Sequence, residues 1–342
     1  MELRITLKPY CLPFRQTMLT AHGPWVEREG VLVRLEDESG RVGYGEAAPV
    51  RGFGGGTLAE VTARLGALGD RARSETLVEV AAEGGGVGFA LGAALMAFGN
   101  AEAGLDFTPK HDYLPVAGLL PAGRGVLAAI EPKLELGFRT FKWKVGVGDP
   151  QDERGILDDL LSRLPTGCKL RLDANGAWDR RRAEAWLECC AERPMIEFVE
   201  QPVATGDDRG RDLMLGLAED YPTVLALDEA VTDLRDLQRW ADNGWRGVFV
   251  VKPALAGDPA ALMAGLAERP WDVVFSTALE TAIGARTVLT MAFAASGKGR
   301  ALGTGVWPLF NGHVLNGPTA MPFVRWFDVA ALNSEAAWNA AS

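Results

Sequence analysis

Six short apolar runs of the sequence each end in a residue that could take part in chemistry. These residues are Lys144, Asp173, Glu200, Asp228, Lys252 and Ser276, at successive intervals of 29, 27, 28, 24 and 24 residues. Chance placement would scatter polar residues along the runs. Each interval is the length of one strand and one helix, so the pattern predicts βα units whose strand ends gather at the face that carries the chemistry of a barrel.

Three of these residues, Asp173, Glu200 and Asp228, are carboxylates on consecutive runs. Neighbouring strands lie about 4.8 Å apart, so the three charges would repel unless a cation lay among them. Oxygen ligands alone favour a hard divalent ion, and the three are predicted to bind Mg²⁺, with Mn²⁺ as an alternative ion. The competing interpretation is three separate helix caps that meet water.

Lysines stand on both sides of the carboxylates in the chain. Lys142 and Lys144 flank Trp143, and residues two apart on a strand point to the same side, so both lysines should face the barrel interior. Lys252 ends the run that lies opposite theirs in an eight-stranded barrel. A metal ion and the Lys142 ammonium would favour neutral Lys144, which could then act as a base. The alternative is that these lysines are solvent-exposed at the barrel rim and have no catalytic role.

The elements that must position these residues fall into two parts. Residues 1–10, 31–36 and 41–46 have the pattern of strands and are followed by helical periodicity at 58–68, 76–82 and 87–102, which predicts a small α+β domain. After that, strands alternate with helices, and the predicted strands are 114–119, 140–145, 169–173, 196–200, 224–228, 248–252, 273–276 and, weakly, 300–303. This predicts an α/β barrel. A doubly wound sheet is disfavoured because no Gly-x-Gly-x-x-Gly follows the first strand.

Composition narrows the classes of function. The 342 residues include 35 Lys plus Arg and 45 Asp plus Glu, a net charge of −10, which argues against a nucleic-acid partner. The four cysteines and three histidines show no zinc spacing. The longest apolar stretch, about 87–98, is too short to cross a bilayer, and no targeting segment is visible. We therefore expect a cytoplasmic protein without a membrane partner; the oligomeric state stays open.

Taken together, the motifs resemble those of the enolase superfamily, and within it the muconate-lactonizing subgroup. They are Lys-x-Lys at 142–144, Asp-Ala-Asn at 173–175, Glu-Gln-Pro at 200–202, Asp-Glu at 228–229 and Val-Lys-Pro at 251–253. The resemblance implies a TIM-like (β/α)7β barrel at 109–310. It also implies an N-terminal α+β capping domain at 1–108 and a C-terminal segment, 311–342, that returns to the cap. Lys144 and Lys252 would be the acid/base pair of this subgroup.

Further motifs resemble a dehydrating branch of the subgroup. They lie at 12–14, 28–30, 43–49, 52–54 and 276–284. This resemblance implies a carbon–oxygen lyase that dehydrates a small carboxylate substrate. Lys144 would take the proton α to the carboxylate and return it to the departing hydroxide, while Lys252 stabilises the anion. Lys142 would help to hold Lys144 neutral and would contact the carboxylate. The loops at 15–21 and 51–56 would close over the site from the cap.

Five residues are candidates for binding the substrate: Asn175, Ser276, Thr277, Gly303 and Arg171. Asn175 could instead orient a metal ligand. Ser276, Thr277 and the backbone around Gly303 are candidates for a distal carboxylate. Arg171 lies two residues before Asp173 and should also face inward, where a buried structural partner is its alternative role.

Other functions remain open from the sequence. A racemase of N-succinylamino acids or a cycloisomerase would use the same mechanism. The stretch Leu302–Gly305 lacks the acid pair that dipeptide epimerases of this subgroup usually carry near the eighth strand. A barrel that binds a ligand without catalysis would not need both lysines and all three carboxylates. A metal-dependent hydrolase would usually place histidines at the strand ends.

Overall fold

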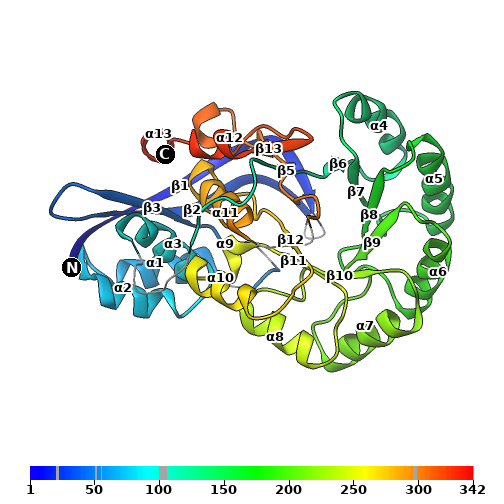
Figure 1. The fold of residues 1–342 in the computed structure, drawn as a ribbon, viewed down its shortest axis with the longest axis horizontal. Helices are drawn as coiled ribbons and strands as arrows, with labels where there is room; N and C mark the ends of the chain where they lie inside the picture. The colour runs from blue at the N-terminus through cyan, green and yellow to red at the C-terminus, as the bar shows by residue number, and fades with distance from the viewer. Residues whose placement is uncertain (21–22, 51, 55, 100–105, 296–298, 342) are drawn as a thin grey trace.

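The N-terminal part is an antiparallel sheet covered by helices on one face. The computed structural model describes residues 1–20, 23–50, 52–54, 56–99, 106–295 and 299–341. Its cap sheet has the strand order β3-β2-β1-β4, and Figure 1 shows it at the end of the molecule where the chain starts. The strands are β1 (Glu2–Thr20), β2 (Gly23–Glu36), β3 (Val42–Ala47) and β4 (Arg71–Arg73).

Strand β1 is much longer than predicted. Residues 15–20, expected to form a loop, continue the strand. After an irregularity between Pro13 and Met18, residues 18–20 pair with β2; Ala21 lies outside the described residues. The alternate residues Tyr10, Leu12 and Phe14 are all buried in the core that the cap shares with the barrel. Their packing explains why the strand extends beyond the cap's own core. The predicted hairpin of 31–36 with 41–46 is confirmed by the β2–β3 pairing.

Helices α1 (Leu58–Gly66), α2 (Ser74–Ala81) and α3 (Gly85–Leu95) complete the cap. α3 is buried almost all round because it packs on β3 and also contacts the barrel helix α9 (Pro253–Ala256). A Cβ atom on Gly43 or Gly45 of β3 would lie 1.9 Å from a carbonyl oxygen of α3. Glycine at these two positions therefore allows the close contact between strand and helix.

The second part is a parallel barrel, as predicted. Seven strands are hydrogen-bonded in the order β12-β11-β10-β9-β8-β7-β6. They are β6 (Gly118–Leu120), β7 (Thr140–Lys144), β8 (Lys169–Asp173), β9 (Ile196–Glu200), β10 (Leu225–Leu227), β11 (Val248–Val251) and β12 (Val273–Phe275). Among the described residues, the weak eighth run makes only the parallel bridges Val116↔Leu302 and Ser276↔Gly303. These bridges join the two edges of the sheet and close the barrel.

The first predicted barrel strand is divided in the structure. Its beginning, β5 (Tyr113–Pro115), pairs antiparallel with β13 (Phe323–Arg325) of the C-terminal segment. Only β6 joins the barrel, because Val116 and Ala117 turn from one sheet to the other and make their contacts with the Leu302 segment.

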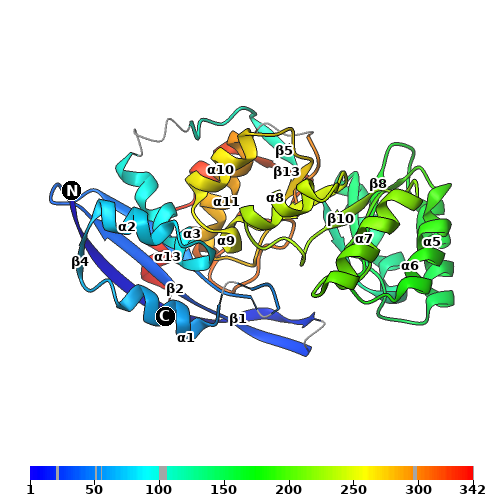
Figure 2. The same cartoon turned by 90° about the horizontal axis from the view of Figure 1, so that it is seen from below.

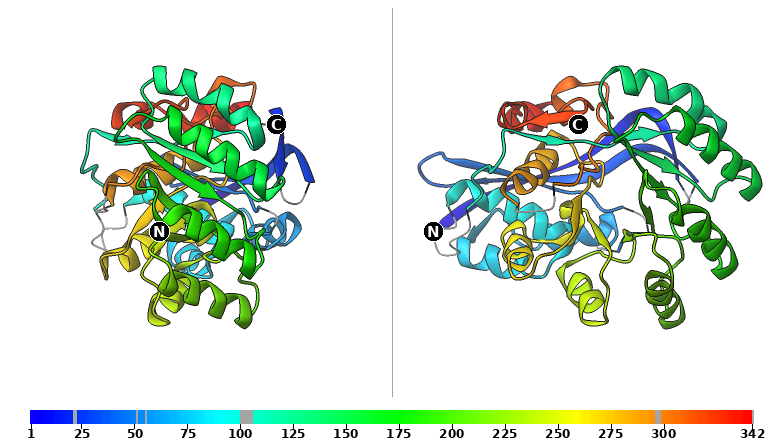
Figure 3. Two further views of the ribbon diagram at one scale, coloured as in Figure 1. Left: turned by 90° about the vertical axis from the view of Figure 1, so that its right-hand side faces the viewer. Right: turned by 45° about the vertical axis from the view of Figure 1, so that its right-hand side comes forward.

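Helices surround the barrel, as Figures 2 and 3 show for α5, α6 and α7. They are α4 (Val126–Glu135), α5 (Pro150–Arg163), α6 (Arg180–Ala191), α7 (Asp208–Asp220), α8 (Leu234–Asp242), α9, α10 (Pro259–Ala267) and α11 (Ala282–Ala294). Five of them start after an aspartate whose carboxylate accepts hydrogen bonds from the first turn, namely Asp149, Asp179, Asp207, Asp233 and Asp258. Within the described residues, no helix has the length and apolar character needed to span a membrane.

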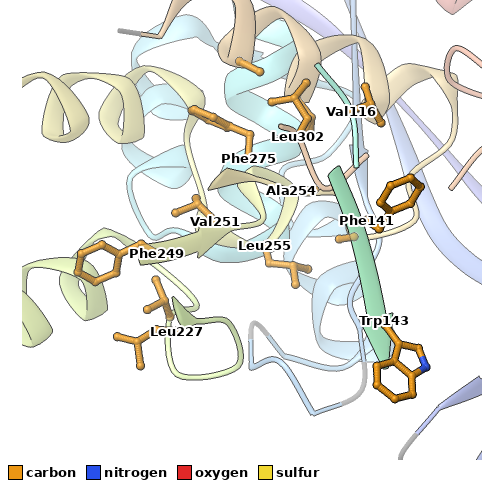
Figure 4. Packing of buried hydrophobic residues seen from close by; sticks show 14 of the residues in the cluster. Val116, Phe141, Trp143, Leu227, Phe249, Val251, Ala254, Leu255, Phe275 and Leu302 are labelled. Carbon is orange, nitrogen blue, oxygen red and sulfur yellow. The ribbon is translucent and has the colours of Figure 1, made fainter. Parts of the chain in front are cut away.

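Apolar packing fixes which side chains face the site. Phe198, Ala226, Val248, Val250 and Val274 form a cluster of their own among the barrel strands. A much larger cluster lies between strands and helices and extends into the cap; Figure 4 shows part of it, with Phe141 and Trp143 on the same side of β7. Both are fully buried, so the lysines between and after them point the other way.

The C-terminal segment contacts the cap. Helices α12 (Trp326–Ala330) and α13 (Ser334–Ala340) follow β13. Lys8 of β1 donates a hydrogen bond to the carbonyl of Trp338 at 2.8 Å, and the Trp338 and Tyr44 rings are 5.9 Å apart. The division into 1–108, 109–310 and 311–342 remains a prediction.

Candidate functional site

The three predicted carboxylates lie together at the carboxyl ends of neighbouring strands. Asp173 ends β8, Glu200 ends β9 in register with it, and Asp228 directly follows β10. All three are buried, with exposed fractions of 6%, 1% and 4%. Strand register therefore concentrates three acidic groups where little water reaches them.

Lys142 lies between two of these carboxylates. Its Nζ atom is 2.8 Å from Asp173 Oδ2 and 2.7 Å from Glu200 Oε1. Burial alone would lower the pKa of Lys142, but the charges of Asp173, Glu200 and Asp228 outweigh burial and hold that pKa well above its usual range. The three carboxylates therefore favour the ammonium form of Lys142, which neutralises part of the acidic cluster.

The carboxylates still carry more negative charge than this one ammonium neutralises. Burial raises the pKa of Glu200 well above its usual range, and Asp173 and Asp228 add to the effect against the opposing charge of Lys142. Burial also acts to raise the pKa of Asp228, but Lys252 and Lys142 together lower it. A further positive charge at this point would stabilise all three ionised groups.

The donor set fits a hard divalent cation. It offers carboxylate oxygens from three adjacent strands and neither nitrogen nor sulfur, which suits Mg²⁺. Within the described ranges, no three Asp, Glu, His or Cys side chains already surround one point as metal ligands. In the structure the positive charge next to these carboxylates comes from lysine ammonium groups. Lys142 pairs with Asp173 and Glu200, and Lys252 pairs with Asp228.

Lys252 lies on the far side of the carboxylates from β7. It follows β11, and Pro253 begins α9 directly after it, which fixes the backbone at the lysine. Its ammonium pairs with Asp228. The same Nζ atom lies 4.2 Å from the ring centroid of Phe53, which comes from the predicted cap loop. A cap residue therefore covers this lysine through a cation–π contact. Phe53 lies in the motif at 52–54 and in the loop 51–56 that was expected to close over the site, but the residue itself had no predicted contact.

Lys144 ends β7 in register with Asp173. Its side chain is half-buried, and Trp143 beside it is fully buried on the opposite face of the strand. In the described part of the chain, Lys144 makes neither an ion pair nor a hydrogen bond through its ammonium group. Of the two lysines predicted to act as acid and base, it is the one not engaged by a carboxylate.

A second layer of polar side chains holds the carboxylates in place. Asn175, with a φ of 45°, donates its backbone N–H to Asp173 Oδ1 at 3.0 Å and its side-chain amide to Glu229 Oε1 at 3.0 Å. Gln201, with a φ of 41°, accepts the backbone N–H groups of Asp228 and Ala230 through Oε1. These contacts favour the orienting role of Asn175. Gln201 had no predicted role, although the Glu-Gln-Pro motif contained it.

Glu229 is a further residue without a predicted role. Burial, together with the charges of Asp228 and Asp173, raises its pKa to about 7. Its position next to Asp228 was the signal that could have found it. The structure explains its environment, since Asn175 bonds one carboxylate oxygen while the other is buried without a partner among the described residues.

The candidates for a distal carboxylate also lie together. Ser276 follows β12 and donates its hydroxyl to the carbonyl of Gly303 at 3.1 Å. A Cβ atom on Gly303 would lie 2.6 Å from Ser276 Oγ, so this contact requires glycine. The Thr277 hydroxyl donates to Glu280 and accepts the N–H of Leu279 at 2.8 Å. Thr277 thus organises its own loop.

Arg171 is the one candidate that the structure places apart from the others. It lies one inward-facing position before Asp173, and its Nε atom is 2.7 Å from Glu197 Oε2. Arg300 binds the same carboxylate at 2.7 Å, and both guanidinium groups lie over the Phe198 ring. This cluster at the amino ends of the strands supports the structural role that the sequence left open for Arg171.

The sequence of this chain is similar to those of known proteins. A family model described as enolase C-terminal domain-like matches residues 126–318. The o-succinylbenzoate synthase of Thermosynechococcus vestitus is 40% identical over 282 residues, covering 81% of this chain and 84% of the relative. The enzyme of the same name from Pectobacterium atrosepticum is 29% identical over 82% of this chain and 83% of its own.

Solved structures of similar proteins superpose on this chain. The crystal structure of o-succinylbenzoate synthase from Thermosynechococcus elongatus BP-1, with magnesium in its active site, superposes with a TM-score of 0.80 at 36% identity, over 93% of this chain and 96% of that one. The N-succinyl Arg/Lys racemase of Bacillus cereus gives a TM-score of 0.81 at 17% identity, over 95% of this chain and 93% of that one. At that identity the racemase shows only a shared fold.

Proposed function

The chain belongs to the enolase C-terminal domain-like family of the enolase superfamily, and from this premise we propose that it catalyses o-succinylbenzoate synthesis. The reaction is the syn-dehydration of 2-succinyl-6-hydroxy-2,4-cyclohexadiene-1-carboxylate to 2-succinylbenzoate. This makes the chain a hydro-lyase of the muconate-lactonizing subgroup that serves menaquinone or phylloquinone biosynthesis. Its substrate is then a small carboxylate, it binds neither nucleic acid nor a membrane, and it acts in the cytoplasm.

One observation carries the proposal more than any other. Strands β7 to β11 lie in unbroken order, with the acidic residues of β8, β9 and β10 between a lysine at each side. Lys144 and Lys252 can therefore face a bound carboxylate substrate from two directions. Acid/base groups on both sides of an acidic ligand set suit chemistry at the carbon next to a carboxylate.

Asp173, Glu200 and Asp228 would hold Mg²⁺, and Mn²⁺ is a reasonable substitute because it prefers the same oxygen ligands. When bound, the cation supplies positive charge beside the substrate carboxylate as electrons move into it. Asn175 and Gln201 keep Asp173 and Asp228 in place through the hydrogen bonds described above. Lys142 balances charge next to Asp173 and Glu200.

Lys144 carries the proton transfers. As a neutral amine, its Nζ atom takes the proton from ring carbon 1, and the electrons of the broken C–H bond enter the carboxylate group. These electrons then form the C1–C6 double bond while the C6–O bond breaks and the ring becomes aromatic. The Lys144 ammonium returns its proton to the departing hydroxide, which leaves as water. Proton removal and return occur on one face, so one lysine serves both steps.

Lys252 has a different role in this scheme. Held by Asp228 and covered by Phe53, it keeps a positive charge at the opposite face of the substrate ring. That charge stabilises the delocalised anion formed after proton loss. Ser276 and the Gly303 backbone are the proposed contacts of the succinyl group.

The experiment is a substrate panel with purified chain and Mg²⁺. We expect the cyclohexadiene to be converted to an aromatic product, followed by ultraviolet absorbance. An N-succinylamino acid in deuterium oxide, followed by polarimetry and proton exchange, tests the racemase alternative. Efficient racemisation without dehydration would replace the proposed reaction, whereas dehydration with slow racemisation would support it.

A further inference from the structure

Two charged residues of the cap are fully buried against a barrel loop, away from the acidic cluster. Arg28 of β2 and Glu46 of β3 are each 1% exposed. Both contact the segment 276–281 between β12 and α11, more than 230 positions away in the chain. A buried charge is costly unless it is fully hydrogen-bonded, so the contacts of these two residues define what they do.

Glu46 caps the barrel helix α11 from outside. Its carboxylate accepts the backbone N–H of Thr281 at 3.0 Å, the Thr281 hydroxyl at 2.6 Å and the N–H of Gly284 at 3.0 Å. The Tyr10 hydroxyl donates to it as well, at 2.6 Å. A carboxylate at a helix N-terminus is stabilised by the unpaired N–H groups and the helix dipole. Glu46 therefore ties the cap to the first turn of α11.

Arg28 holds the preceding residues of the same segment through their carbonyl groups. Its guanidinium donates to the carbonyl oxygens of Ala278 at 3.1 Å and Leu279 at 3.2 Å. It also bonds the carbonyls of Ala48 and Pro49, which follow β3 in the cap. One planar guanidinium thus joins a cap strand end to the barrel loop with fixed geometry.

The loop has a conformation that needs such support. Leu279 has a φ of 66°, an unfavourable region for a residue with a branched side chain. Inside the loop, Glu280 accepts the N–H of Ala278 at 2.7 Å and the hydroxyl of Thr277. The carbonyl of Leu279, at the strained residue, is one of the two that Arg28 holds. A hydrogen bond from the cap is therefore made at the residue whose backbone conformation is unfavourable.

We propose that Glu46 and Arg28 are positioning residues that set the shape of segment 276–281 and thereby the binding of the succinyl group. The inference rests on the proposed function, which assigns Ser276 and Gly303 to that group. Neither cap residue touches the reacting carbons in this scheme. Their loss should therefore weaken substrate binding more than it slows the chemical step.

A glycine on the barrel side offers an independent probe of the same contact. A Cβ atom on Gly284 would lie 2.9 Å from Glu46 Oε2 and 2.8 Å from Glu280 Cβ. Gly284→Ala should therefore push Glu46 from the helix end without altering any charge. Alanine is otherwise favoured over glycine in a helix. Without the conflict with Glu46 and Glu280, Gly284→Ala would therefore be expected to stabilise α11.

The experiment compares Glu46→Gln, Arg28→Lys and Gly284→Ala with two controls within the cap, Glu36→Gln and Arg34→Lys. Arg34 and Glu36 pair with each other at 2.8 Å on β2, far from the loop. Tyr10→Phe is the milder variant, because it removes one hydrogen bond to Glu46 and keeps the ring. For each protein with Mg²⁺, kcat and KM of dehydration are measured, together with calorimetric binding of 2-succinylbenzoate and of benzoate.

We expect KM to rise by about tenfold in the three variants, the effect of losing a charge-assisted hydrogen bond, with kcat within about threefold of wild type. The preference for 2-succinylbenzoate over benzoate should shrink by a similar factor, and the controls should match wild type. Tyr10→Phe should show a smaller shift in the same direction. Unchanged KM and ligand preference in Glu46→Gln and Gly284→Ala would overturn the inference, even if their melting temperatures fell.

The outcomes also separate this inference from the proposed function. A wild-type chain that dehydrates the cyclohexadiene while the variants keep their KM would overturn the positioning role alone. A wild-type chain that neither binds 2-succinylbenzoate nor dehydrates the cyclohexadiene would overturn the proposed function and the inference with it. A fall in kcat with constant KM would place the two residues in the chemistry and contradict their role in substrate binding.

Discussion

The two lysines of the site differ in their partners, and that difference predicts different responses to substitution. Lys252 pairs with Asp228 and lies under Phe53, whereas Lys144 pairs with no carboxylate among the described residues. If Lys144 is the base, both Lys144→Ala and Lys144→Arg should lose dehydration by several orders of magnitude, because a guanidinium stays protonated at working pH. Lys252→Arg keeps the charge and should retain more activity than Lys252→Ala. Single-turnover dehydration of the four variants measures this.

The order of these four rates decides the assignment. Near-ultraviolet circular dichroism of each variant serves as the control for folding, since several tryptophans, Trp143 among them, are buried in the core. An active Lys144→Arg beside a Lys252→Arg that is as inactive as Lys144→Ala would place the base on β11 instead of β7.

The acidic cluster predicts dependence on a divalent ion. Glu200→Gln removes one negative charge and one ligand but keeps the shape of the side chain, so turnover should vanish while the protein stays folded. In wild type, chelator should abolish activity and Mg²⁺ should restore it. Because an ion that binds only the folded state stabilises it, Mg²⁺ should also raise the melting temperature of wild type. Glu200→Gln should show a much smaller rise.

Full wild-type activity in excess chelator after dialysis would contradict the metal site. The matched control is Glu197→Gln on the same strand. Glu197 bonds Arg171 and Arg300 at the opposite ends of the strands, so its loss should lower stability without removing the response to Mg²⁺.

At this scale the sequence predicted the residues that end strands and missed those that depend on backbone detail. Asp173 and Glu200 were singled out because each ends a periodic apolar run, and both lie at strand ends in the structure. Gln201 acts through a positive φ that no periodicity reveals. The resemblance pointed to the loop at 51–56 but not to Phe53 itself, because its contact with Lys252 joins cap and barrel and leaves no local pattern in the chain.

Among the elements, strands with strong periodicity were predicted best. The bounds of β8 and β9 agree with the predicted runs, because each has buried residues on both faces and a clear polar end. The first run was wrong in part, since its start pairs with β13, more than 200 positions away. The weak eighth run forms isolated bridges instead of a regular strand. Its position depends on the distant residues Val116 and Ser276, and little in its own sequence favours a strand.

Helix α3 shows how an element of the cap helps to place a helix of the barrel. A Cβ atom on Gly92 would lie 2.1 Å from Asp258 Oδ1 and 2.7 Å from Pro259 Cδ, at the start of α10. Gly92→Ala should gain about 1 kcal/mol of helix propensity but lose about 1–3 kcal/mol to overpacking, so we expect a net loss of stability. Urea unfolding measures the free energy.

Gly66→Ala is the matched control, because Gly66 ends α1 with open space around its Cβ position. It should leave stability unchanged or raise it. Equal stability gains in both variants would mean that α3 does not press on the start of α10.

At the scale of the whole molecule, cap and barrel share one core. Leu12, Phe14 and Phe89 of the cap belong to the cluster that fills the space between barrel strands and helices. Leu35 belongs to the cap's own cluster, together with Val31 and Val33. Strand β2 serves both, since Leu32 between these two valines joins the larger cluster. Separating the two parts would expose this shared apolar surface and leave Arg28 and Glu46 without their barrel partners.

This continuity predicts that cap and barrel unfold together. Leu35→Ala removes a fully buried side chain that faces only the cap, at a cost of about 2–5 kcal/mol. In a cooperative molecule, amides of β11 in the barrel should lose the same free energy as amides of β2, although β11 lies far from the substitution. Hydrogen exchange in low denaturant, read by mass spectrometry, measures both strands at once. Exchange that accelerates in β2 while β11 keeps its wild-type protection would show that the cap opens independently, and that the buried contacts of Arg28 and Glu46 are too weak to couple the two parts.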